Sequence, residues 1–450
     1  MRHKEALMFC TIHLSKSDPT PLYIQLTNAL AGLIKNGDLP NHTKLPTIRT
    51  LSKKLNINRD TVVNAYKLLE NQGLVTAHVG SGTYVASPQT VSTPSKCETI
   101  PCSNLSFSKD YFPTTLILEL TNQIISTEGW GAFSDPLYRG HNLLKQSISN
   151  FFKSVGILSC PSQVRYSKHF PTFLIDLLKT HPNSTICVEA YHDLSYSSFL
   201  RSLGIKVIEI PVTEKGLDIK VLKQLLKTEH ISFVWISTYV QNPTGISYSM
   251  EVKEELLHLA ELHNFYIIED GTLSDFAYTE DLLLPLYTLA ESEKVIYIYH
   301  FSRLYLPAFQ YTFIALPNTL TKRLNEPSSY SFNERFLQYY LDSQVFSSIR
   351  QTIIESTQQN FHLLLSVFKT LNNVVSLYSE QGSLFFFIKP ELISASDLEK
   401  HFLQKHIVLA PGELFTMKSK SPYFRISLAH LNTTTLPLVV DALKGISDLA

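Results

Sequence analysis

The sequence contains few of the features that would suggest a secreted, metal-binding or membrane protein. Its 450 residues include five cysteines, an odd number with neither C-x-x-C spacing nor paired histidine motifs, so neither a disulfide framework nor a zinc site is expected. No apolar run approaches the roughly 18 residues of a membrane helix, and the N-terminus lacks the apolar region and cleavage site of a signal peptide. These absences predict a cytoplasmic protein with reduced thiols, no bound metal and no membrane contact.

The chain as a whole also lacks an excess of either charge. Lys plus Arg and Asp plus Glu both number 39, while 44% of the residues are hydrophobic, which is ample for a buried core in a chain long enough for two or three domains. Up to Ala86, however, ten basic residues stand against five acidic ones, an excess of five. Any electrostatic attraction to nucleic acid is therefore expected from this first segment.

The composition changes twice along the chain. Residues 87–104 are rich in proline, serine and threonine and show no periodicity, which is typical of a linker. Residues 1–86 show helical patterns, whereas residues 105–450 alternate short apolar strands with helical stretches. This alternation predicts a mostly parallel sheet covered on both faces, followed by a smaller α+β lobe. The strands of the sheet are expected at residues 185–190, 206–212, 231–237, 265–270 and 294–300.

The first segment predicts three helices and a two-stranded wing. The first helix starts near Leu22 and is stopped by Gly37, and two more are expected at about 47–55 and 59–72, with Asn58 as the N-cap of the last. Two helices joined by a short turn and followed by a wing form a winged helix-turn-helix, whose last helix can enter the major groove of DNA. A small protein-interaction domain with a solvated basic face is the alternative, but pattern, turn, wing and charge agree on DNA.

The residues available to DNA lie on the last two helices, just before them and on the wing, where basic side chains and backbone amides can contact phosphates. The expected set is Lys44, Arg49, Arg59, Thr61, Asn64, Lys67 and Gly80. The stretch "KLPTIRTLSKKLNINRDTVVNAYKLLENQGLV" followed by "GSGTYV" resembles the DNA-binding domain of GntR-type transcriptional regulators. By this resemblance, Arg49, Arg59 and Gly80 touch operator DNA.

The second segment resembles the fold-type I aminotransferases. Their signature segments are matched in order by "VQNPTGISYS", "YIIEDGTLSDFAY", "YHFSRLYLPAFQYTFIALP", "LAPGELF" and "YFRISLA". A GntR-type head joined by a linker to such a domain is typical of the MocR subfamily of regulators. The resemblance implies an α/β fold, with a winged helix-turn-helix followed by a large α/β/α sheet domain and a small C-terminal α+β lobe. It also implies double-stranded DNA and a second copy of the chain as partners.

The resemblance extends only partly to the cofactor site of this family. Asn242 matches the residue that bonds the phenolic oxygen of pyridoxal phosphate, Asp270 the carboxylate that pairs with its pyridinium nitrogen, and Arg425 the arginine that grips a substrate carboxylate. By contrast, Thr272 stands where the family has an aromatic residue, and Gln310 where it has an arginine that grips the phosphate. The last replacement removes a charge-assisted bond of roughly 1.5–3 kcal/mol.

Arg303 occupies the position of the Schiff-base lysine, 33 residues after Asp270. A guanidinium with a pKa above about 12 stays charged and is not nucleophilic, so no internal aldimine can form. We therefore expect no catalytic residue and no covalent cofactor, with pyridoxal phosphate bound at most non-covalently. Two arrangements remain open: Arg303 and Arg425 face a common cavity that binds a small anionic effector, or Arg303 pairs with Asp270 and fills the vacated space.

These observations favour a DNA-binding transcriptional regulator whose second domain dimerises and can sense a small molecule. The alternative is a pyridoxal-phosphate-dependent, aminotransferase-like enzyme with an appended DNA-binding domain, which would need the missing lysine. A third interpretation, a dimerisation domain without a ligand, differs from the first only in whether small molecules raise its melting temperature.

Overall fold

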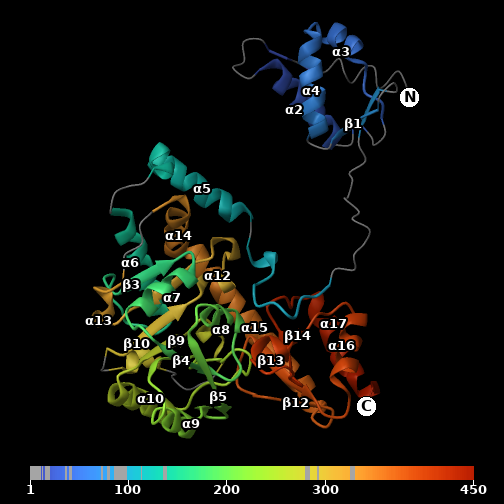
Figure 1. The fold of residues 1–450 in the computed structure, drawn as a ribbon. Coiled ribbons are helices and arrows are strands. Elements are labelled where there is room, and N and C mark those ends of the chain that lie inside the picture. Colours follow the sequence, from blue (N-terminus) through green and yellow to red (C-terminus); the bar gives the residue numbers. More distant parts are fainter. Residues whose placement is uncertain are drawn as a thin grey trace. The chain divides into compact units, whose positions relative to one another are not determined.

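The computed structural model divides the chain into two compact units, residues 1–97 and 98–450. Both units are drawn as ribbons in Figure 1. The residues that the structure describes are 12, 14–15, 21–35, 38–39, 43–71, 74–78, 82–85, 99–112, 114–134, 139–278, 284–290, 293–324 and 330–449. Among them, no helix combines the length and the apolar character of a membrane span, and no group of three metal-ligating side chains is arranged to hold a metal ion.

The first unit is a three-helix domain with a two-stranded wing. Its elements are α2 (Leu22–Lys35), α3 (Ile48–Leu55), α4 (Arg59–Asn71), β1 (Val75–His78) and β2 (Gly82–Val85). The two strands pair antiparallel. The predicted winged helix-turn-helix is therefore confirmed, while the predicted helix stop at Gly37 lies outside the described residues.

Local signals set the helix starts of this unit. Thr47 caps α3 by accepting a hydrogen bond from the Thr50 backbone N–H at 3.2 Å, and the Asn58 side chain accepts one from the Asp60 N–H at 3.4 Å, as expected of N-cap residues. The core is formed by the apolar faces of the three helices together with the ends of both strands. Its fully buried members include Leu26, Leu30, Leu51, Val62, Ala65, Leu69, Val75 and Val85.

The second unit is built on a seven-stranded mixed sheet. In spatial order its strands are β3 (Val164–Ser167), β11 (Thr312–Ala315), β10 (Val295–Tyr299), β9 (Tyr266–Asp270), β8 (Ile231–Ile236), β4 (Thr185–Glu189) and β5 (Lys206–Ile210). The five predicted strands are the parallel ones. The two that the sequence analysis did not predict lie at one edge, where β11 runs antiparallel to both of its neighbours.

Helices cover both faces of this sheet. Successive strand residues point to opposite sides, and both sets are apolar here, so each face packs against helices. Residues such as Ile296 and Ile298 pack with α7 (Phe170–Lys179) and α8 (Leu194–Ser202). The alternate residues Tyr297 and Tyr299 pack on the other face, in the cluster that contains Phe151 and Phe152. That face is covered by α6 (Arg139–Ser154), α9 (Ile219–Leu225) and α10 (Met250–His263). The predicted three-layer α/β/α arrangement is confirmed.

The C-terminal part forms the small lobe, which the sequence also predicted. Its antiparallel sheet has the order β12 (Val375–Leu377), β13 (Phe385–Pro390), β15 (Phe424–Ser427) and β14 (Ala410–Pro411). Helices α16 (Ala395–Gln404) and α17 (Thr435–Lys444) flank it, and α15 (Gln344–Thr370) leads into it (Figure 1). The remaining elements are η1 (Lys109–Tyr111), α5 (Thr114–Glu128), η2 (Gly129–Phe133), β6 (Val212–Thr213), β7 (Gly216–Leu217), η3 (Ser274–Phe276), α11 (Leu286–Leu289), α12 (Phe301–Leu304), η4 (Pro307–Phe309), α13 (Asn318–Thr321), α14 (Phe332–Asp342), η5 (Gly412–Phe415) and η6 (Gly445–Leu449).

The second unit begins earlier than the sequence suggested. The linker was predicted to extend over residues 87–104, but Ile100 already forms a bridge with Ile407 of the small lobe, and Cys102 is fully buried. A single backbone bridge requires no particular side chains. The composition of residues 99–104 therefore did not show that they belong to the second unit.

Candidate functional site

The predicted DNA-binding residues are accessible on the first unit. Lys44, Arg49, Arg59, Asn64 and Lys67 are exposed and Thr61 is half-buried. Arg59 begins α4, the helix expected to enter the major groove, and the Lys44 ammonium lies 5.5 Å from the centre of the Tyr84 ring, beside the wing. Gly80 lies outside the described residues.

The second site lies where four parallel strands end. Asp193 follows β4, Asn242 follows β8, Asp270 ends β9, and Arg303 follows β10. The carboxyl ends of parallel strands lie at the same edge of a sheet, which is where ligands of such folds bind. Asn242, Asp270 and Arg303 were predicted from the sequence, whereas Asp193 was not.

Arg303 pairs with Asp193 and not with Asp270. The Nη2 of Arg303 donates to Asp193 Oδ2 at 2.5 Å, and the two side chains are 26% and 35% exposed. Burial would raise the pKa of Asp193, but the Arg303 charge and hydrogen bonds from Ser195 outweigh it and lower the pKa to about 2. The predicted pairing with Asp270 is wrong because Asp193, the N-cap of α8, lies nearer.

Asp270 is held by its own neighbours. Its Oδ1 accepts hydrogen bonds from the Thr272 N–H at 3.0 Å and the Thr272 hydroxyl at 2.5 Å, while its Oδ2 lies 3.8 Å from His300 Nε2. The Thr272 hydroxyl also accepts from the His300 N–H. Burial lowers the pKa of His300 to about 4, so this imidazole is neutral and Asp270 has no full positive charge beside it from that side.

Arg425 bonds to two neutral oxygens. Its Nη1 donates to Asn242 Oδ1 at 2.6 Å and its Nη2 to the carbonyl oxygen of Ser103 at 2.7 Å. The guanidinium also lies over the Phe415 ring, 4.7 Å from its centre. Burial, together with the charge of Arg303, lowers the pKa of Arg425 to about 9.

Aromatic side chains occupy the space beside Arg303. Tyr196 stacks on Trp235 on one side and on His300 on the other, each with ring centres 5.3 Å apart, and the edge of Phe170 meets all three rings. Tyr196, Trp235 and His300 were not singled out from the sequence. The only signal in the sequence was that these positions are aromatic. Because 11% of the chain is aromatic, this signal has little specificity.

Two cavities border this group. The first has a volume of about 50 Å³ and is lined by Val188, Glu189, His192, Asp193, Tyr196, Ser197, Trp235, Ser237, Asn242, Asp270 and Arg303. The second, of about 430 Å³, is lined by Lys168, His169, Phe170, Pro171, Tyr196, His300, Ser302, Arg303, Pro307, Gln310, Tyr311 and Thr312. Arg425 lines neither of them, so neither is the predicted common cavity of Arg303 and Arg425.

The residues present do not fit covalent pyridoxal phosphate. Arg303 stands at the lysine position and is paired with Asp193. The two cavities that Asn242, Asp270 and Arg303 line together hold about 50 Å³ and about 20 Å³, well below the roughly 300 Å³ lower range of ligand pockets. Pro171 in the first turn of α7 removes one amide that could bind a phosphate. Gln310, which stands where the family has an arginine, lines the other cavity.

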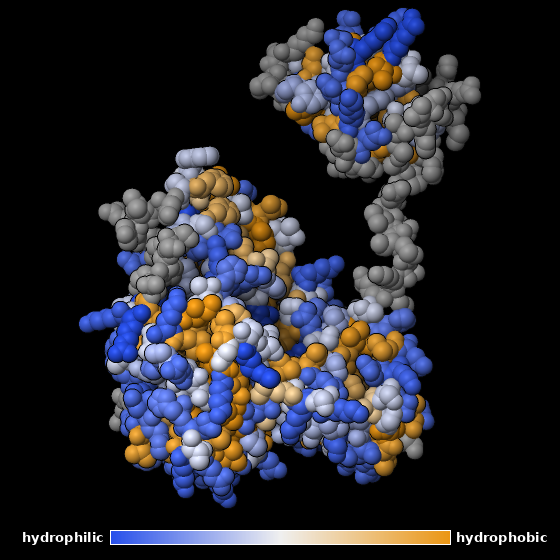
Figure 2. Space-filling model, in the orientation of Figure 1, coloured by the Kyte–Doolittle hydropathy of each residue, from blue (hydrophilic) through white to orange (hydrophobic). Residues whose placement is uncertain are grey.

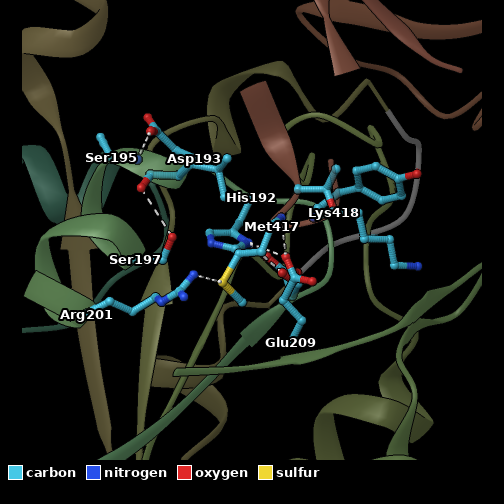
Figure 3. A network of polar contacts seen from close by, with 12 residues as sticks. His192, Asp193, Ser195, Ser197, Arg201, Glu209, Met417 and Lys418 are labelled. Carbon is cyan, nitrogen blue, oxygen red and sulfur yellow. Dashed lines mark hydrogen bonds and ion pairs between the residues drawn. The ribbon is translucent and has the colours of Figure 1, made fainter. Parts of the chain in front are cut away.

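A further set of contacts joins the small lobe to the sheet domain beside the first cavity (Figure 3). The Met417 N–H donates to Glu209 Oε1 of β5 at 2.9 Å, Arg201 of α8 donates to the Met417 sulfur at 3.5 Å, and the His192 N–H donates to the Phe415 carbonyl. These contacts come from both lobes, so they hold the lobes together next to the cavity.

Comparison with known families gives two matches that agree with these units. Residues 22–85 match the profile of bacterial regulatory proteins of the gntR family. Residues 114–443 match that of aminotransferase class I and II. The first match covers the winged helix and the second covers the sheet domain with the small lobe.

Similar proteins combine the same two parts or share the second fold. The chain is 24% identical to YdfD, an HTH-type transcriptional regulator of Bacillus subtilis (strain 168), over 96% of each chain. It is 25% identical to the probable rhizopine catabolism regulatory protein MocR of Rhizobium meliloti, over 68% of each chain. The crystal structure of a multiple substrate aminotransferase from Thermococcus profundus aligns with a TM-score of 0.66 at 19% identity, covering 81% of this chain and 97% of that one.

Proposed function

We propose that this chain regulates transcription without covalent pyridoxal chemistry. It belongs to the aminotransferase class I and II family and, with its GntR-type head, to the MocR subfamily of DNA-binding transcriptional regulators. The observation that carries this proposal is the ion pair between Arg303 and Asp193 at the end of β10. A permanently charged guanidinium cannot attack an aldehyde, and its counter-ion holds it in place. The aminotransferase-like domain then acts as a binding and assembly domain and has no catalytic residue.

The experiment that tests this is borohydride reduction of the full chain with added pyridoxal phosphate, followed by peptide mass spectrometry. The wild-type chain is expected to give no visible aldimine band and no reduced adduct above the level found at exposed lysines such as Lys227. Arg303→Lys is also expected to give none, because the new ammonium would pair with Asp193 and the cavity remains small. A stoichiometric wild-type adduct at one lysine, such as Lys168 of the second cavity, would overturn the proposal and favour the enzyme instead.

The cavity of about 430 Å³ is the better candidate for an effector site. Its size falls within the range of small-ligand pockets, and Arg303, Lys168 and Gln310 lie on its wall. Lys168 is partly neutralised by Glu334 at 3.2 Å, and Arg303 by Asp193. Their net field therefore favours a small anion of low charge, including pyridoxal phosphate held without a covalent bond.

A thermal-shift series with inorganic phosphate, acetate, succinate and pyridoxal phosphate tests this part. A ligand at a hundred times its Kd stabilises the folded state by about 2.7 kcal/mol, which raises the Tm by several degrees in a chain of this size. Gln310→Glu places a negative charge on the wall of the cavity and is expected to reduce the shift. If no anion in the series raises the Tm, the domain is a ligandless assembly domain.

An exposed apolar patch supports a second copy of the chain as partner. Leu118, Ile125, Trp130 and Phe133, on α5 and η2, are 58%, 41%, 83% and 57% exposed, and Figure 2 shows apolar surface over this part of the second unit. Contiguous exposed apolar residues of this kind mark protein interfaces. A homodimer would also present two heads to two half-sites of an operator.

Sedimentation of matched variants tests the dimer. Trp130→Ser combined with Phe133→Ser is expected to weaken self-association at low micromolar concentration. Leu262→Ser is the control, because Leu262 is 66% exposed on α10, which lies far from α5 in the second unit (Figure 1). Equal behaviour of both variants would place the interface elsewhere.

A further inference from the structure

The chain that follows the linker is fastened to the small lobe. We call residues 99–108 the anchoring segment. The Ile100 N–H donates to the His406 carbonyl at 2.7 Å, the Val408 N–H to the Ile100 carbonyl at 3.0 Å, and the Ser427 N–H to the Cys102 carbonyl at 2.7 Å. Because the head precedes this segment in the chain, the segment is the point at which the second unit holds the tether of the head.

Arg425 contacts three separate parts of the second unit at once. Its backbone belongs to β15 of the small lobe, its Nη2 donates to Ser103 in the anchoring segment, and its Nη1 donates to Asn242, which belongs to the sheet domain. The side chain of Asn242 also forms part of the wall of the 50 Å³ cavity. A single guanidinium therefore connects the cavity wall to the anchoring segment.

The environment makes this guanidinium sensitive to its two partners. It is only 5% exposed, its buried Nε has no hydrogen-bond partner, and none of the ion pairs among the described residues includes it. The nearby carboxylate of Asp193 is already paired with Arg303. A buried charge is stable only when hydrogen bonds compensate its desolvation. If Arg425 loses its bond to Asn242, its side chain must therefore shift, and its bond to Ser103 must weaken.

We propose that Arg425 transmits the state of the cavity wall to the anchoring segment, and so to the tether of the DNA-binding head. The 430 Å³ cavity proposed for the effector shares Arg303 and Tyr196 with the 50 Å³ cavity, so an anion bound there changes the wall that includes Asn242, and with it how firmly Arg425 holds Ser103. The biological input of this relay rests on the proposed effector function. The coupling between Asn242 and the anchoring segment is a property of the chain itself and can be measured without any ligand.

Hydrogen–deuterium exchange of the full chain tests this coupling. Asn242→Ala is expected to raise the exchange of the Ile100, Val408 and Ser427 amides by roughly tenfold, because the lost bond is charge-assisted. Arg425→Gln is expected to raise it at least as much. The double variant is expected to match Arg425→Gln alone, since both changes break the same path.

Two further variants separate the relay from a general loosening of the lobes. Glu209→Ala removes the contact with Met417 seen in Figure 3, and it is expected to raise exchange at Met417 without changing the anchoring segment. Asn242→Asp supplies the carboxylate that Arg425 lacks, and it is expected to slow exchange of the anchoring segment. If Arg425→Gln does not fold, Arg425→Lys replaces it, because one ammonium cannot reach both acceptors in the same geometry.

The outcomes distinguish the relay from the proposed function. Unchanged exchange of the anchoring segment in Asn242→Ala, additive effects in the double variant, or faster exchange in Asn242→Asp would each overturn the relay. None of these results depends on an effector, whereas a covalent pyridoxal adduct would overturn the proposed function and leave the relay standing.

Discussion

Substituting Asp193 by asparagine removes the counter-charge of Arg303 and leaves a guanidinium that is only 26% exposed. The free energy at stake follows from the pKa of Asp193. Burial raises this pKa, but Arg303 and the Ser195 contacts lower it overall, from 3.8 to about 2. At about 1.4 kcal/mol for each tenfold change, this corresponds to about 2.5 kcal/mol, and screening at the 35% exposed carboxylate reduces it to roughly 1–1.5 kcal/mol.

We expect Asp193→Asn to lower the free energy of unfolding by about 2 kcal/mol, because it also leaves Arg303 unpaired near the Arg425 charge. Arg303→Met should lower it by about 1 kcal/mol, since the remaining carboxylate is better solvated and the repulsion of Arg425 disappears. The double variant should then recover a coupling energy of about 1 kcal/mol. Trp235 fluorescence during urea unfolding, in a Trp130→Phe background, reports on this unit because the chain has two tryptophans.

The sign of the pH dependence gives a second readout of the same pair. The pKa of Asp193 is lowered in the folded state, so the stabilisation is present above about pH 4 and is lost as the pH falls toward 2. The difference between wild type and Asp193→Asn should therefore be constant near neutral pH and shrink only in acid. A coupling energy indistinguishable from zero would refute the ion pair as the element that holds Arg303.

Three further predictions concern the head and the buried carboxyl of β4. Arg59→Ala should weaken operator binding by about 1–3 kcal/mol or relax sequence preference, measured by fluorescence anisotropy, with the second-unit variant Lys227→Ala unchanged. If two heads place about eight cations on phosphates, the logarithm of the binding constant should fall with a slope of about −7 against the logarithm of salt concentration, and a slope near zero would exclude this surface. Burial raises the pKa of Glu189 to about 8, so the folded state holds an extra proton and the stability of the wild type should fall as the pH rises from about 4.5 to 8. Glu189→Gln should remove this fall in stability, as monitored by Tm across that range.

The fold was largely predictable because its signals are local and repeated. Alternating apolar strands and helices fixed the parallel part of the sheet, and the pattern of cap, turn and wing fixed the head. Strands β3 and β11, at one end of the sheet, were missed because such short and almost wholly buried strands show no alternation. The pairing of β11 with β3, far away in the chain, also leaves no local pattern.

The site was predictable only as far as the positions of single residues. The resemblance to the aminotransferases identified Asp270, at the end of a buried strand, and Arg303, 33 residues later. Asp193 has a recognisable sequence role, because an aspartate two residues before Ser195 at a helix start is a typical N-cap. Nothing in that role indicates that its other carboxylate oxygen faces Arg303, 110 positions later in the chain.

The partner of Arg303 changes what the loss of the lysine means. If Arg303 had paired with Asp270, the carboxylate that matches the cofactor-binding aspartate of the family would be occupied. Substituting Arg303 alone would then free Asp270. Instead Asp270 keeps its bonds to Thr272, a separate carboxylate neutralises the guanidinium, and aromatic rings stack beside it. We therefore expect that a lysine placed at position 303 would form no aldimine while Asp193 remains to pair with its ammonium.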